Sequence, residues 1–258
     1  MSRFSGRVVL VGAGPGAADL LTLRALRAIE GADTVLFDAL VCADVRALIP
    51  ATARRIEVGK RGHRPSTPQD FINRLMARLA RGGATVVRLK GGDPSMFGRA
   101  AEECAFLERN GVTVEVIPGI TTASAAAAQF GFSLTERETA RRVLYATGRT
   151  AHGAALDWTT AVDAATTLCL YMGCADIRAI AANLVAAGRA PATPAMAAID
   201  VERPGARLVR STLAALPDAL TAERLDGPVL IIIGQACARA HASDAPELLR
   251  RARGLPAC

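Results

Sequence analysis

The segment Val8–Ala17, which reads VVLVGAGPGA, decides the class of fold. Its first four residues are apolar and mostly β-branched, which is typical of a short buried strand. Three glycines follow, at Gly12, Gly14 and Gly16, and glycine lets a ligand or another backbone approach closely. The pattern predicts a strand that ends in a tight turn before a helix, which is the repeating unit of an α/β sheet.

The first half of the chain repeats this alternation of strands and helices. Further strands are expected at Thr34–Phe37, Arg54–Val58, Thr85–Leu89 and Thr113–Ile117. Two amphipathic helices are expected, over Leu20–Glu30 and over Gln69–Ala80. Their expected buried faces are Leu20, Leu23, Leu26 and Ala28 in the first and Phe71, Ile72, Leu75, Met76 and Leu79 in the second. This alternation predicts a mostly parallel sheet that helices cover on both faces.

The second half continues with strands and changes their connections. Strands are expected at Val143–Ala146, Thr167–Tyr171, Ala195–Ile199, Leu208–Ser211 and Val229–Ile233, after a helix over Thr121–Gln129. The short gap between Ile199 and Leu208 permits a hairpin, and therefore a sheet of mixed strand direction. We expect two α/β domains, residues 1–119 and 120–237, followed by a polar, arginine-rich tail at 238–258.

The composition limits what kind of protein this is. Hydrophobic residues make up 51% of the 258 residues, which excludes general disorder. No apolar run approaches the roughly 18 residues of a membrane helix, and the polar start lacks a signal-peptide core. We therefore expect a soluble, cytoplasmic protein that binds no membrane. The net charge of +7 reflects either GC-rich coding or an anionic partner. Only 4% of the residues are aromatic, which argues against a surface that stacks single-stranded bases, and we expect no nucleic-acid partner.

The six cysteines and three histidines are scattered along the chain. No pair of cysteines has the C-x-x-C spacing, and no histidine stands near one, so we expect no metal site. Buried, reduced thiols are the expected state of the cysteines.

Two glycine-rich loops at the ends of expected strands are candidates for ligand binding. Gly12–Ala17 matches the G-x-G-x-x-A pattern of a dinucleotide site, although a plain strand–helix turn has the same glycines. Gly91 and Gly92 follow another strand and would bring bare backbone to a ligand, with Asp93 as a hydrogen-bond acceptor.

Two further loops carry polar side chains at strand ends. Asp38 follows one strand, and Lys60 and Arg61 follow the next. Such residues serve as general acid or base, or as helix caps and surface ion pairs. Thr121 and Thr122 follow a Pro-Gly hinge, where their hydroxyls cap the next helix or face a ligand.

Taken in this order, the motifs resemble those of the tetrapyrrole methylase family. The stretches that carry the resemblance are VGAGPG at 11–16, VLFD at 35–38, GKR at 59–61, KGGDP at 90–94, FGR at 97–99, PGITT at 118–122, LTER at 134–137, YMG at 171–173 and GPVLIIIG at 227–234. Together they cover about residues 7–235. Within the family they look most like the members that methylate uroporphyrinogen III at two ring carbons to give precorrin-2.

The resemblance implies S-adenosylmethionine as cofactor, S-adenosylhomocysteine as its product, no metal, a cofactor cleft between two α/β domains and a homodimer. At the family's motif positions, the implied cofactor contacts are Pro15, Gly91, Gly92, Asp93, Met96, Thr121, Thr122, Met172, Val201 and Val229. The implied catalytic residues are Asp38 as proton acceptor, Lys60 as proton donor and Arg99. The implied contacts to a substrate with many carboxylates are Arg61, Arg99 and Glu102.

Some positions depart from the family's pattern. They are Ala17, Ala39, Thr122, Glu136 and Val201, and the changes at Ala39 and Glu136 alter charges that bear on the choice of substrate. A later precorrin C-methyltransferase of the same fold is therefore the nearest alternative. From a different class, a flavin or nicotinamide oxidoreductase that uses Gly12–Ala17 is a further alternative.

Overall fold

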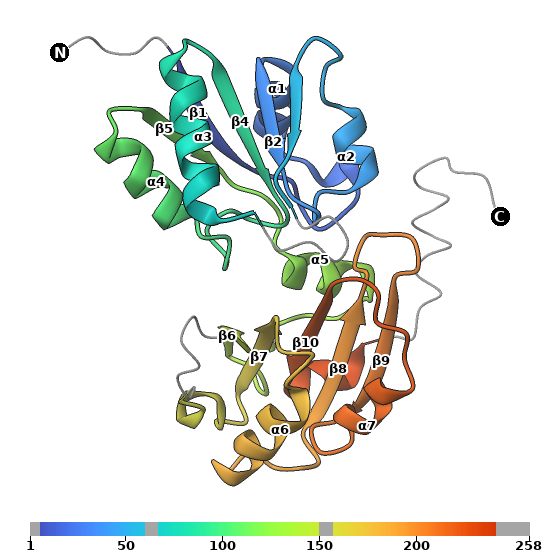
Figure 1. The fold of residues 1–258 in the computed structure, drawn as a ribbon. Coiled ribbons are helices and arrows are strands. Elements are labelled where there is room, and N and C mark those ends of the chain that lie inside the picture. The colour runs from blue at the N-terminus through green and yellow to red at the C-terminus, as the bar shows by residue number, and fades with distance from the viewer. Residues whose placement is uncertain (1–5, 60–66, 150–156, 241–258) are drawn as a thin grey trace, which may run out of the picture. The chain divides into compact units, whose positions relative to one another are not determined.

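The structure, a computed structural model, describes residues 6–59, 67–149 and 157–240. The chain divides into two compact units, Met1–Thr121 and Thr122–Cys258 (Figure 1). Each unit contains one five-stranded sheet. The finer division expected from the sequence, at 1–119, 120–237 and 238–258, stays a prediction.

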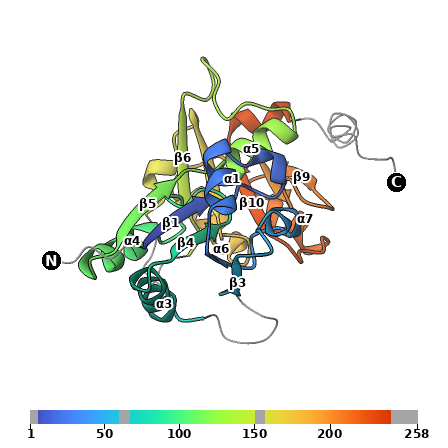
Figure 2. The same cartoon turned by 90° about the horizontal axis from the view of Figure 1, so that it is seen from above.

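The first unit is a parallel sheet between two layers of helices, as the alternation predicts. Its elements are β1 (Arg7–Gly12), the 3-10 turn η1 (Ala18–Leu20), α1 (Leu23–Glu30), β2 (Thr34–Phe37), α2 (Ala43–Ala47), β3 (Arg54–Glu57), α3 (Gln69–Arg81), β4 (Thr85–Lys90), α4 (Ala100–Arg109) and β5 (Thr113–Ile117). The strands lie in the order β3-β2-β4-β1-β5, and all neighbours pair in parallel. Figures 1 and 2 show α3 and α4 on one face of this sheet and α1 on the other.

Strand alternation supplies a separate core to each face of this sheet. Val9 and Val11 of β1 pack into the same cluster as Ile29 of α1. Val8 and Leu10, the intervening residues, pack with the helices of the opposite face. Each fully buried side chain of this kind contributes about 1.5–3 kcal/mol of transfer free energy. The sheet is therefore a rigid platform for the loops at its edges.

The expected buried face of the first helix was wrong in part: Ala28 packs against the core of that face, but Leu23 does not. Helix α1 begins at Leu23, because Thr22 caps it: the Thr22 side chain accepts a hydrogen bond from the Ala25 amide at 3.1 Å. Ala25 and Ile29 face the sheet, whereas Leu23 is 72% exposed. In α3, likewise, Phe71 was expected on the buried face but is exposed, whereas Ile72 and Met76 are buried.

The second unit has a mixed sheet, also as expected. Its elements are α5 (Thr122–Gln129), β6 (Arg142–Thr147), η2 (Thr159–Ala161), β7 (Thr166–Tyr171), α6 (Ile177–Ala186), β8 (Pro194–Ile199), β9 (Arg207–Thr212), α7 (Leu216–Thr221), β10 (Val229–Ile233) and η3 (Gln235–Arg239). The strand order is β6-β7-β10-β8-β9. Strands β6 and β7 are parallel, and β8 and β9 form the expected antiparallel hairpin. Helices α6 and α7 pack into the same apolar cluster as β7 and β10.

No helix in the described residues combines the length and the apolar character needed to cross a bilayer.

Candidate active site

Three strand-end loops of the first unit meet at the carboxyl edge of its sheet. The Gly92 amide donates to the Gly14 carbonyl at 2.7 Å, and the Gly14 amide donates to the Gly92 carbonyl at 3.1 Å. Gly119 lies against both loops, because a Cβ added to it would stand 2.3 Å from the Gly92 oxygen and 2.8 Å from the Cα of Gly12. Backbones can approach this closely only where side chains are absent. The loops after β1, β4 and β5 therefore form one continuous surface.

Asp93 fastens two of these loops together. Its Oδ2 accepts a hydrogen bond from the Gly119 amide at 2.9 Å, and its Oδ1 accepts from the Ser95 amide at 2.8 Å. Gly92, just before it, has φ +70°, and a Cβ there would meet no atom of the described residues within 4 Å. The turn thus exposes bare backbone beside a carboxylate whose position is held by the protein.

The loops after β2 and β3 extend the same edge. A Cβ on Gly91 would stand 2.7 Å from the Leu40 Cβ, and one on Gly59 would stand 2.3 Å from the Ala39 amide nitrogen. The structure therefore brings Asp38, which precedes Ala39, to the edge that holds the glycine loops. The Asp38 carboxylate accepts from the Leu40 amide at 3.0 Å and lies 3.4 Å from Arg88, and its side chain is 26% exposed.

Lys60 and Arg61, the expected proton donor and one expected substrate contact, lie outside the described residues.

Arg99 and Glu102 pair with each other on the surface of the first unit. Arg99 precedes α4 with φ +58°, and its Nε and Nη2 donate to the two oxygens of Glu102 at 3.0 and 2.6 Å. The hydrogen bond from Arg99 lowers the pKa of the Glu102 carboxyl, and the same bond raises the pKa of Arg99. Arg99 is therefore a permanent cation, suited to hold a carboxylate and unsuited to act as a base.

In the second unit, the strand register gathers three of the expected cofactor residues at one edge. Tyr171 is paired with Leu230, and Ile199 with Val229. Met172 follows β7 directly and Val201 follows β8 after Asp200, so both lie at the edge where β10 begins with Val229.

Helix α5 is tied to this edge by two hydrogen bonds. The amide of Ala123, next to Thr122, donates to the Tyr171 hydroxyl at 3.2 Å. The amide of Glu202 donates to the Gln129 side chain at 2.9 Å. Thr122 is thereby held near the end of β7, with Met172.

Strained backbone marks the same edge. Met172, Asp200 and Glu202 have φ of 54°, 50° and 59°, a left-handed conformation that residues other than glycine rarely adopt. Such strain costs about 1–3 kcal/mol per residue and concentrates at functional sites. Met172 is 49% exposed, whereas Val201 is only 2% exposed, so Met172 offers the accessible surface at this edge.

A cluster of buried charges that was not predicted from the sequence lies behind Asp38. Arg88, Lys90 and Glu103 are at most 5% exposed. Burial lowers the pKa of Lys90, and the neighbouring Arg88 lowers it further, while Glu103 opposes the shift. The signal was present, because β4 reads TVVRLK and a buried parallel strand is normally apolar throughout.

The Gly12–Ala17 loop lacks the geometry of a dinucleotide site. Such a site places the pyrophosphate on a helix that starts directly behind the glycine turn. Here a 3-10 turn follows, and α1 begins only at Leu23. The backbone of Gly14 is also already paired with Gly92.

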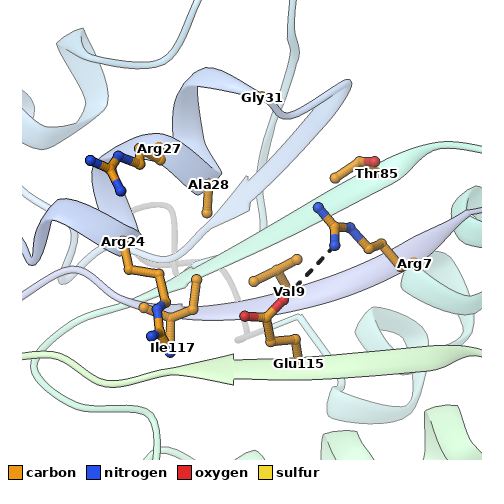
Figure 3. Close-up of a pocket in the computed structure, with 9 residues that line it drawn as sticks. All are labelled: Arg7, Val9, Arg24, Arg27, Ala28, Gly31, Thr85, Glu115 and Ile117. Atoms are coloured by element: carbon orange, nitrogen blue, oxygen red, sulfur yellow. Dashed lines mark ion pairs between the residues drawn. The ribbon is translucent and has the colours of Figure 1, made fainter.

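A pocket of about 200 Å³ lies elsewhere in the first unit, beside α1 and β5 (Figure 3). It is lined by Arg7, Val9, Arg24, Arg27, Ala28, Gly31, Thr85, Glu115 and Ile117. Arg7 faces Glu115 across 3.9 Å (Figure 3). None of the expected site residues lines this pocket. Within the described ranges, no three His, Cys, Asp or Glu side chains are grouped as metal ligands.

The fold places this chain among the open α/β proteins, a class in which ligands bind at strand-end loops. The particular family follows from comparison with known proteins. Residues 7–217 match the family model of the tetrapyrrole (corrin/porphyrin) methylases. The chain belongs to this family.

Two curated proteins and one solved structure are similar to this chain over most of its length. The chain is 43% identical over 248 residues to the uroporphyrinogen-III C-methyltransferase of Paracoccus denitrificans, covering 95% of this chain and 86% of that protein. It is 46% identical over 231 residues to the siroheme synthase of Pseudomonas putida, covering 89% of this chain but only 50% of that protein. A solved structure of the uroporphyrin-III C-methyl transferase of Thermus thermophilus, complexed with S-adenyl homocysteine, matches with a TM-score of 0.77 and 39% identity over 90% of this chain and 99% of that one.

Proposed function

We propose that this chain transfers methyl groups from S-adenosylmethionine to two ring carbons of uroporphyrinogen III, giving precorrin-2. The observation that carries the proposal is the 43% identity that extends over 95% of this chain and 86% of a uroporphyrinogen-III C-methyltransferase. The S-adenyl homocysteine bound to the similar Thermus thermophilus enzyme supports the choice of cofactor.

The residues at both edges suit such a cofactor. The bare backbone at Gly92 leaves room that a Cβ would fill. Pro15, Gly91, Asp93, Met96 and Thr121 belong to the same edge of the first unit; Thr122, Met172, Val201 and Val229 belong to the edge of the second. When bound, the cofactor supplies an electrophilic methyl group on a sulfonium ion. What the protein adds is alignment of that methyl group with the attacking ring carbon.

The protein's own residues have two proposed tasks: to transfer protons to or from the macrocycle, and to bind the carboxylates of the substrate. After the ring carbon gains its methyl group, protons must be lost from or gained by the macrocycle to settle its double bonds. Asp38 is the proposed proton acceptor, and the partial exposure of its carboxylate at the strand-end edge supports this role. Lys60 is the proposed proton donor. Arg61, Arg99 and Glu102 are the proposed contacts to the carboxylate-rich substrate, with Arg99 released from Glu102 when it binds a substrate carboxylate.

An anaerobic assay with uroporphyrinogen III and methyl-labelled S-adenosylmethionine, read by product mass, tests the proposal. We expect a product that has gained two methyl groups. Asp38→Asn and Lys60→Ala should slow turnover and leave cofactor affinity, measured by calorimetry, unchanged. Cofactor binding without transfer to uroporphyrinogen III would contradict the proposed substrate and favour a later precorrin as methyl acceptor.

We further propose that the enzyme is a cytoplasmic homodimer without nucleic-acid or membrane partners. Light scattering coupled to size-exclusion chromatography measures the mass directly. A monomeric mass of 26.8 kDa at micromolar concentration would overturn the dimer.

A further inference from the structure

A continuous row of four charged side chains runs from the interior of the first unit to its strand-end edge. Lys90 Nζ lies 3.0 Å from Oε2 of Glu103, and Arg88 Nε lies 3.6 Å from Oε1 of the same carboxylate. The other end of the Arg88 guanidinium, Nη2, lies 3.4 Å from Oδ2 of Asp38. Two cations and two carboxylates are thus balanced, and only Asp38 is partly exposed.

Strand β4 and helix α4 create this row. Arg88 and Lys90 are two residues apart, so both point to the same face of β4. Glu103 sits in the first turns of α4, which packs on that face, and its side chain is fully buried. Gln69 of α3 donates to Oε1 of Glu103, the oxygen that faces Arg88, at 2.9 Å. Glu103 is therefore held from three sides.

Stability alone does not account for the row. Buried ion pairs often contribute no more than apolar residues of similar size, because taking charges out of water is costly. Arg88 even keeps its Nε without a hydrogen bond among the described residues, although a buried donor without an acceptor costs about 1–3 kcal/mol. What the row does provide is a guanidinium that lies between two carboxylates, with one nitrogen directed at Asp38.

We propose that Glu103 is a positioning residue: it holds Arg88, and Arg88 fixes the Asp38 carboxylate in the orientation that accepts the proton. This inference rests on the proposed function, in which Asp38 is the proton acceptor. Arg88 interacts with the carboxylates of both Glu103 and Asp38. Because Glu103 attracts one side of the guanidinium, Arg88 does not move closer to Asp38. Without Glu103, Arg88 has Asp38 as its one remaining carboxylate in the row and draws it out of position.

The test is Glu103→Gln, which keeps the shape of the side chain and removes its charge. We expect kcat to fall about 100-fold, the loss typical of a small misplacement of a reacting group. KM for uroporphyrinogen III and the affinity for S-adenosylmethionine should stay within about twofold. Glu108→Gln, the same change on the exposed side of α4, is the matched control and should leave kcat unchanged.

A double-mutant cycle of Glu103→Gln with Asp38→Asn distinguishes a positioning role of Glu103 from a purely structural one. If Glu103 acts through Asp38, adding Glu103→Gln to Asp38→Asn slows turnover no further. An equal loss in both backgrounds, or an unchanged kcat in Glu103→Gln, would overturn the inference and leave the proposed function intact. An unchanged kcat in Asp38→Asn alone would instead overturn the proposed role of Asp38.

A second variant covers the case in which Glu103→Gln does not fold. Lys90→Met combined with Glu103→Gln removes one buried cation together with one buried anion, so no charge is left uncompensated. We expect this double variant to unfold near the wild-type temperature and still to show the reduced kcat. Wild-type kcat in the folded double variant would contradict the proposal.

Discussion

The amide of Gly119 donates to Oδ2 of Asp93 across 2.9 Å, so the carboxylate that follows β4 holds the loop that follows β5. From the sequence, Asp93 was expected to contact the ligand. The structure adds that this carboxylate also fixes the backbone on which the ligand would lie. A change at Asp93 should therefore affect binding in two ways.

Asp93→Ala should lower the affinity for S-adenosylmethionine by about tenfold or more, since hydrogen bonds to a charged group contribute about 1.5–3 kcal/mol. The matched control is Asp33→Ala. Asp33 accepts from the Thr85 amide at 2.8 Å, a similar bond from a loop to the start of β4 at the opposite edge of the sheet. Calorimetry should show a loss of affinity in the first variant and not in the second. Equal affinities would contradict the role given to Asp93.

Gly12→Ala should lower the free energy of unfolding by about 1–3 kcal/mol, the range for overpacking. Its Cβ would stand 2.4 Å from the Gly119 amide nitrogen, and neither backbone can yield. Gly31→Ala is the control, because the nearest atom to its Cβ is 3.5 Å away and its φ is −92°. Denaturant titration of both variants measures the difference. Equal midpoints would argue against close contact of the two loops.

Met172→Gly should weaken cofactor binding and yet stabilise the protein, or leave its stability unchanged. Glycine relieves the left-handed backbone at φ 54°, which costs about 1–2 kcal/mol for other residues. Met172→Ala keeps the strain and removes the exposed thioether, so it should weaken binding without any gain in stability. Melting temperatures and cofactor titrations of the two variants provide the comparison. Wild-type affinity in both would remove Met172 from the site.

Cys169 makes stability depend on pH above neutrality. Burial raises the pKa of its thiol from 9.0 to about 12. The folded state then keeps a proton that the unfolded state releases, so this contribution is complete below pH 9 and is lost as the pH rises from 9 toward 12. At pH 10 the loss amounts to about 1.4 kcal/mol. Cys169→Ala should show a shallower decline in unfolding free energy between pH 8 and pH 10, and identical slopes would count against this effect.

Much of the fold was predictable because its signals are local. Each of the ten strands in the described residues was expected within a residue of its observed limits, since a short β-branched run between turn residues is typical of a strand. The face of α1 was missed because three leucine positions suggested one stripe, whereas the cap at Thr22 set the start of the helix and turned Ala25 and Ile29 inward.

The candidate site also has a part that the sequence predicts and a part that it does not. Gly12 and Gly92 were expected from the sequence to lie in ligand-binding loops, and Gly119 in a hinge, because glycines at strand ends are themselves a signal. That all three backbones touch depends on strands far apart in the chain. The row from Lys90 to Asp38 was not predictable, since Glu103 is an ordinary helical glutamate until α4 packs on β4.

The sequence by itself determined the two α/β sheets, the strand-end loops and the family, because apolar periodicity and motif order are written along the chain. Only the tertiary structure decided which polar groups became partners. Burial turns Arg88, Lys90 and Glu103 from charges that water would solvate into groups that must satisfy one another. Their exposed end is Asp38, and that placement follows from the register of β2 against β4 rather than from any local pattern.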